Sequence, residues 1–191
     1  MRGMILPGVL TGLVLFATPG VADEARYASP SGMFSIATTD FADRHFQAGP
    51  EQVVGDVVVV DFPAMNTMGL PQTWRRSVEW IKLDKPVDPA QCDAQATDAV
   101  AGYLDGRFDG KLVVAGRGKF RDADGRPVYA FAAAGSFNRL AAQWQGAVLF
   151  FDTGVALVSD VAAAPAHPAQ PLNGVIDQAT IDWAQTLRPG R

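Results

Sequence analysis

The segment 120–137, FRDADGRPVYAFAAAGSF, restricts the fold more than any other part of the chain. Its Asp124-Gly125 dipeptide accepts the positive φ angles of a two-residue hairpin turn, and alternating side chains flank it on both sides. Such a turn fixes the register of the two arms, so that Lys119 faces Ala130. The sequence therefore predicts an antiparallel hairpin around this dipeptide.

The predicted hairpin, residues 111–137, has one face of rings and one basic face. Tyr129 and Phe131 point inward, where Gly118 leaves room for a ring. A register shifted by one residue would bury Arg117 instead, which is unfavourable for an unpaired charge. The basic residues of the outer face are Lys111, Arg117, Lys119 and Arg121.

The basic outer face has two interpretations. It is a surface that binds an anion or an acidic partner, or it keeps a long ribbon soluble and discourages pairing between sheet edges. Charged strand faces are common, so the pattern alone leaves both interpretations open.

Residues 1–22 have the pattern of a secretory signal peptide. Arg2 precedes an apolar stretch, and small residues at Gly20 and Ala22 follow it. The apolar stretch is too short and too interrupted to span a bilayer comfortably. We expect cleavage after Ala22, which leaves residues 23–191 as a single periplasmic or secreted domain without a membrane span; an uncleaved anchor is the alternative.

Charge and cysteine content exclude several classes of protein. Removal of Arg2 leaves 15 basic and 20 acidic residues, a net charge of −5, which argues against binding nucleic acid or anionic lipid through the net field. Cys92 is the only cysteine, so no disulfide within the chain is available. Its thiol is buried or pairs with another chain, and its expected place on a helix favours burial.

Strand patterns recur along the rest of the chain. Short strands are expected near 26–28 and 33–37, and longer ones over 52–62 and 74–84, with Gly55-Asp56 as an undecided turn in the first of these. A second hairpin is expected over about 144–161, around Thr153-Gly154. Its arms are apolar on consecutive residues, which is typical of central strands covered on both faces.

Two helices are expected. The first begins after a cap at Asp88 and ends at Gly106, and the second begins near Asn173 and ends before Arg188. The predicted buried stripe of the first is Ala90, Ala94, Thr97, Ala101 and Leu104. That of the second is Ile176, Thr180, Trp183 and Leu187. An antiparallel sheet with a helical layer on each face, an α/β/α sandwich of the α+β class, accommodates these elements.

Three local patterns carry a resemblance to a known family. They are YASPSGMFSIATT, GKFRDADGRPVYAFAAAGS, and GAVLFFDTGVALVS followed by a closing helix with Trp183. Over most of residues 25–188 the chain resembles the PsbP-like α/β/α superfamily, which includes a photosystem extrinsic subunit and bacterial envelope proteins of the DcrB and Eag-chaperone type. The resemblance implies an α/β/α fold and a non-catalytic accessory role in docking or chaperoning a partner protein.

Residues for catalysis or metal binding do not form a recognisable pattern. His45 and His167 lack Cys or carboxylate neighbours at metal-ligand spacing. Ser136 has no nucleophile-elbow context, and Cys92 has no base nearby in sequence. We therefore predict no enzymatic activity, no metal and no cofactor.

Trp74 and Trp80 share one side of a predicted strand. Aromatic residues beside Arg76 form a partner-binding anchor, or they pack in the core beneath a helix. Both tryptophans join the basic face in our list of partner-binding candidates.

The preferred hypothesis is an exported, non-enzymatic accessory protein that binds another envelope protein or peptide through a sheet or loop surface. The alternative is a small-molecule carrier with an apolar pocket between helix and sheet, lined by Phe131, Phe150 and Trp183. A hydrolase ranks third.

Overall fold

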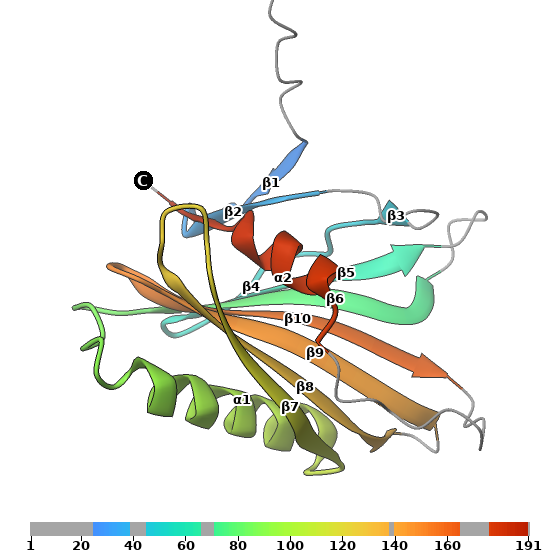
Figure 1. Cartoon of the computed structure of the whole chain (residues 1–191). Helices are drawn as coiled ribbons and strands as arrows, with labels where there is room; N and C mark the ends of the chain where they lie inside the picture. The colour runs from blue at the N-terminus through green and yellow to red at the C-terminus, as the bar shows by residue number, and fades with distance from the viewer. Residues whose placement is uncertain (1–24, 39–44, 66–70, 138–139, 165–175, 191) are drawn as a thin grey trace, which may run out of the picture.

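The computed structural model of the chain describes residues 25–38, 45–65, 71–137, 140–164 and 176–190 (Figure 1). The predicted signal peptide, His167 and the predicted cap Asn173 lie outside these residues. Strands make up most of the described chain and form two antiparallel sheets.

The larger sheet has eight strands. Its order is β3-β5-β6-β10-β9-β8-β7, and β4 also pairs with β5. In chain order the strands are β3 (His45–Phe46), β4 (Gln52–Val54), β5 (Val57–Met65), β6 (Pro71–Lys82), β7 (Leu112–Arg121), β8 (Pro127–Phe137), β9 (Leu140–Phe151) and β10 (Gly154–Ala164). The turn at Gly55-Asp56 does divide β4 from β5, and Val54 pairs with Val57 across it. Gly55 adopts a φ of 60°, which allows the chain to reverse there.

The smaller sheet joins segments from the two ends of the described chain. Strand β2 (Phe34–Ala37) lies between β1 (Arg26–Ala28) and β11 (Arg188–Pro189). The Trp183 indole Nε1 donates a hydrogen bond to the Ala37 carbonyl over 2.9 Å, which ties this sheet to the closing helix.

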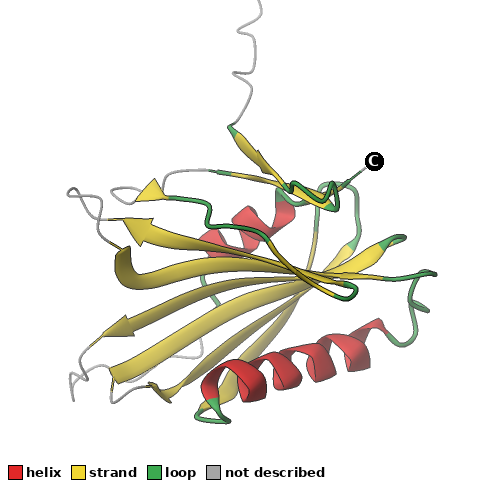
Figure 2. Ribbon diagram, turned by 180° about the vertical axis from the view of Figure 1, so that it is seen from behind, coloured by secondary structure: helices red, strands yellow, loops and turns green. Residues whose placement is uncertain are grey.

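The expected α/β/α sandwich is wrong. Helix α1 (Cys92–Phe108) covers one face of the large sheet, whereas the small sheet and the short helix α2 (Gln178–Gln185) cover the other (Figure 2). The short strands near both ends of the described chain pair with one another, so they supply a β layer where a helical layer was expected. The layout implied by the PsbP-like resemblance is therefore not the layout of this chain.

Two apolar clusters fill the space on the two faces of the large sheet. Beneath the small sheet, the Trp80 ring stacks between Phe34 at 6.2 Å and Phe151 at 5.2 Å. Beneath α1, Tyr103 packs beside Trp144 at 5.7 Å. Strands β9 and β10 contribute to both clusters, which confirms the prediction that their apolar arms are central and covered on both faces.

Helix α1 differs from its prediction in its start, its face and its end. It begins at Cys92 with Gln91 at the N-cap and no side-chain cap, not directly after Asp88. It passes through Gly106 and stops at Asp109, which adopts a φ of 52°. Its buried residues are Cys92, Ala96, Val100, Tyr103, Leu104 and Phe108. Of the predicted stripe only Leu104 is buried, because the helix turns a different face, with Ala96, Val100 and Tyr103, toward the sheet.

Helix α2 matches its predicted stripe. Thr180, Trp183 and Leu187 are buried and Ile176 is partly buried. Asp177 caps the helix, since its side chain accepts a hydrogen bond from the Ala179 backbone.

The hairpin register predicted at Asp124-Gly125 is wrong by one residue. Arg121 pairs with Pro127, and the Gly125 amide donates to the Asp122 carbonyl over 2.9 Å. This is a three-residue loop built on a type I turn, with Gly125 at a φ of 80°. Lys119 therefore faces Tyr129 and Arg117 faces Phe131, so the cations and the rings share one face instead of lying on opposite faces.

Candidate functional site

The predicted basic face lies on an edge strand. β7 ends the large sheet next to β8, and a bulge between Val114 and Gly116 shifts its register. Beyond this bulge, Arg117 and Lys119 project to the α1 side. Cross-strand partners share a face, and their partners Phe131 and Tyr129 belong to the cluster beneath α1.

Arg117 and Lys119 lie over buried aromatic rings. The Lys119 ammonium is 4.8 Å from the centroid of Tyr129, and the Arg117 guanidinium is 5.7 Å from that of Phe131. Arg117 also donates a hydrogen bond to the Thr97 hydroxyl of α1 over 3.5 Å. The rings hold both cations at the edge by cation–π attraction, while the charged ends stay exposed.

The four predicted cations separate into two pairs. Lys111 lies 3.5 Å from Asp109, and Arg121 donates to the Gly125 carbonyl of its own turn. Arg117 and Lys119 have no carboxylate partner among the described residues. Two neighbouring exposed cations thus remain available for an acidic group.

The backbone of β7 also faces outward at these residues. The Asp122 amide bonds to the Arg126 carbonyl, so by strand alternation Arg121, Lys119 and Arg117 direct their N–H and C=O groups away from β8. The Gln185 side chain of α2 covers the Arg121 carbonyl over 3.0 Å. In the described part of the chain, no strand pairs with the remaining outer edge of β7.

The tryptophan candidate Trp80 does not form part of a surface. Trp80 is 1% exposed and lies within the aromatic stack, so it offers no area to a partner in this fold. The side chain of Trp74 is outside the described residues.

Candidate catalytic residues are separated in the structure. Burial and the charge of Asp88 raise the pKa of the Cys92 thiol, and Lys119 opposes them only in part. The thiol is therefore poorly suited to act as a nucleophile at neutral pH. Ser136 is exposed on β8, and His45 lies on β3 across the sheet.

Within the described residues, no three or more His, Cys, Asp or Glu side chains are grouped so that they could hold a metal ion. Nor does this part of the chain contain a helix with the length and apolar character that crossing a membrane requires.

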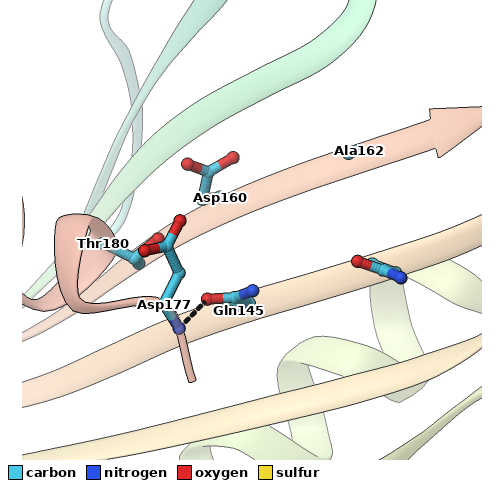
Figure 3. Close-up of a pocket in the computed structure, with 6 residues that line it drawn as sticks. Gln145, Asp160, Ala162, Asp177 and Thr180 are labelled. Atoms are coloured by element: carbon cyan, nitrogen blue, oxygen red, sulfur yellow. Dashed lines mark hydrogen bonds between the residues drawn. The ribbon is translucent and has the colours of Figure 1, made fainter. Parts of the chain in front are cut away.

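A polar cavity of about 150 Å³ lies between the start of α2 and the large sheet (Figure 3). Its lining residues are Gln143, Gln145, Asp160, Ala162, Asp177 and Thr180. Figure 3 shows the Asp160 and Asp177 carboxylates and the Thr180 hydroxyl close together. Gln145 Oε1 accepts a hydrogen bond from the Asp177 amide over 2.6 Å, which fixes the beginning of α2 against β9.

A buried ion pair lies behind this cavity. Arg76 Nε is 3.2 Å from Asp160 Oδ2, and both side chains are almost fully buried. The guanidinium is held between the rings of Phe46 at 4.7 Å and Trp183 at 4.5 Å. The pair thus orients Asp160 at the wall of the cavity.

The cavity differs from the apolar pocket expected of a carrier. Phe131 and Phe150 belong to the cluster beneath α1, on the opposite face of the sheet. Trp183 lines a separate space of only about 10 Å³. Sequence reasoning missed the polar cavity because its residues come from β9, β10 and α2, and no local pattern joins them.

Comparison with known proteins assigns no relative. No protein-family model matches the chain, and no curated protein sequence matches it either.

Proposed function

We propose that this chain is an exported, non-enzymatic accessory protein that binds an extended acidic segment of another envelope protein along the outer edge of β7. The observation that carries the proposal is the pair of exposed cations, Arg117 and Lys119, on a strand whose outer edge has no partner among the described residues.

Strand addition would use both features of this edge. An extended peptide beside β7 would pair with the outward N–H and C=O groups, as in β-augmentation. Its side chains alternate between the two faces, so acidic residues two positions apart would lie opposite Arg117 and Lys119. The backbone would supply affinity, and the two cations would select an acidic sequence and fix its register.

The preformed position of the cations also supports binding. Cation–π contacts with Tyr129 and Phe131 restrict the two long side chains before a partner arrives. A restricted side chain loses less conformational entropy on binding than a free one. Edge protection, the competing interpretation, requires the charges but not a partner of complementary charge.

A labelled peptide with alternating Glu and Thr tests the proposal by fluorescence anisotropy. The double variant Arg117→Glu/Lys119→Glu should weaken binding at least about tenfold, because two attractions become repulsions. The matched control is Lys82→Glu/Lys85→Glu, which reverses two exposed charges elsewhere and should bind like the wild type. N-methylation of the peptide backbone should also weaken binding, because it removes the strand hydrogen bonds.

Equal binding by both double variants would reject the β7 edge as the site. The neutral variant Arg117→Gln/Lys119→Gln distinguishes partner binding from edge protection. If the cations only protect the edge, this variant self-associates in sedimentation experiments and the wild type shows no affinity for the acidic peptide.

A further inference from the structure

The wall of the polar cavity contains the hydroxyl of a buried residue, and this hydroxyl has no hydrogen-bond partner among the described residues. Thr180 is 2% exposed and lines the cavity, and its side chain makes no hydrogen bond to any described residue. A buried hydroxyl is normally satisfied, because leaving water without a replacement bond is unfavourable. The oxygen of this hydroxyl is therefore available to a group that enters the cavity.

The carboxylates beside Thr180 leave one negative charge unbalanced. Asp160 is neutralised by Arg76, whereas Asp177 has no ion-pair partner within 4 Å among the described residues. Asp177 uses Oδ1 to cap α2, accepting from the Ala179 amide over 3.0 Å, and its Oδ2 makes no bond to a described residue. One carboxylate oxygen, one hydroxyl and the side-chain amides thus face a small space with a net charge of −1.

The size of the cavity limits its occupant. About 150 Å³ is well below the roughly 300–1,000 Å³ of sites for drug-sized ligands. Calcium takes about six to eight oxygen ligands, usually with several carboxylates, whereas this wall offers two carboxylates, one already paired with Arg76, beside two amides and one hydroxyl. A compact organic cation with several N–H donors matches the acceptors better than a metal ion.

We propose that this cavity binds a guanidinium or primary ammonium group, with Asp177 as the counter-ion and Thr180 and Asp160 as acceptors. The group belongs to a free small amine or guanidine, or to an arginine or lysine side chain of a protein. None of the lining residues lies on β7, so this proposal and the strand-edge proposal stand or fall separately.

The first test uses a charged probe and its neutral isostere. N-acetyl-arginine methylamide and N-acetyl-citrulline methylamide are titrated into the 15N-labelled protein and followed by amide chemical shifts. We expect the arginine probe to give saturable shifts at residues 143–145 and 177–180, and the citrulline probe to bind at least about tenfold more weakly. Equal affinity for the two probes would overturn the assignment of a cation site.

The second test removes single groups from the wall. Asp177→Asn keeps an acceptable helix cap but loses the charge, and it should weaken the arginine probe at least about tenfold. The matched control is Asp182→Asn, which removes an exposed charge from the same helix outside the cavity and should bind like the wild type. If both variants retain wild-type affinity, the assignment of Asp177 is wrong.

Thr180→Val supplies a separate readout for the hydroxyl. Because the hydroxyl lacks a partner, this near-isosteric variant should fold with an unchanged or slightly higher melting temperature and should bind the arginine probe several-fold more weakly. Unchanged affinity would remove Thr180 from the site.

Methylguanidinium and calcium complete the set of probes. Similar affinity for methylguanidinium and the arginine probe would identify a free small cation, whereas tighter binding of an arginine peptide would identify a protein side chain; both results support the site. Shifts of the same amides by calcium at lower concentration than by either organic probe would overturn the proposal.

Discussion

Strand β6 contributes a residue to three arginine–carboxylate pairs, and two of them, those of Arg76 and Glu79, lie on opposite faces of the large sheet. Arg76 pairs with Asp160 over 3.2 Å on the face beneath α2, with side-chain exposures of 2% and 9%. Glu79 pairs with Arg107 of α1 over 2.9 Å, with exposures of 19% and 31%. The pair with the shorter N–O distance is thus the more exposed one. The contact distance alone therefore does not tell which pair contributes more to stability.

The surroundings of the two guanidinium groups explain the difference. Burial lowers the pKa of Arg76, and Asp160 offsets this effect only in part. Burial also acts to lower the pKa of Arg107, but the hydrogen bond and charge of Glu79 raise it overall. The Arg76 pair is therefore a buried charge held against Asp160, with Asp177 also contributing, whereas the Arg107 pair is a partly solvated link between α1 and the sheet.

The largest predicted effect comes from removing the internal counter-ion. Asp160→Ala leaves the Arg76 charge buried and should lower the free energy of unfolding by about 3–5 kcal/mol, measured by urea denaturation. Replacing both residues, as Arg76→Met/Asp160→Leu, should recover most of this loss, since an apolar pair needs no countercharge. If Asp160→Ala lowers the free energy of unfolding by less than about 1 kcal/mol, as is typical of exposed pairs, the buried pair is energetically no different from the exposed pair.

A smaller effect is expected on the α1 face. Glu79→Gln should lower the free energy of unfolding by about 1 kcal/mol or less, because both side chains remain partly in water. The loss should shrink further in 1 M salt, which screens exposed charges. A salt-independent loss as large as that of Asp160→Ala would show that the two pairs are energetically alike.

The smallest effect concerns the thiol at the start of α1. The folded state raises the pKa of Cys92, so it retains the thiol proton at pH values where the unfolded chain has released it. Stability should therefore fall as pH rises through about 8.5, the pKa of a free thiol. Comparing the free energy of unfolding of wild type and Cys92→Ala between pH 7 and 9.5 isolates the part of the pH dependence that comes from this thiol. Identical pH dependence in the two proteins would mean that folding does not raise the pKa of Cys92.

Sequence patterns located both hairpins but not the register of the first. Asp124-Gly125 indicates a two-residue turn, yet Asp122 and Gly125 also fit the first and last positions of a type I turn. The Asp122 carboxylate accepts bonds from the Asp124 and Arg126 amides and pairs with the Arg126 side chain at 2.7 Å. These contacts stabilise the wider loop, and the Asp–Gly spacing of three was the signal that could have predicted it.

The second layer and the cavity depend on contacts between distant parts of the chain. Helical periodicity correctly predicted that Thr180 is buried, but it gave no sign that its hydroxyl faces a cavity. Asp160 follows an apolar stretch in the sequence, and only the pairing of β10 with β6 brings it beside Arg76. Pairing of β2 with β11 joins residues about 150 positions apart, which no local pattern specifies.

That pairing has a consequence for the order of events during synthesis. The Ala37 amide donates a hydrogen bond to the Thr186 hydroxyl, and the Gly190 amide donates to the Met33 carbonyl. During synthesis β2 therefore has only β1 as a partner until residues 188–190 have been added. Closing the small sheet is thus a late, long-range step, and a variant that ends after Leu187 would leave one edge of β2 without β11.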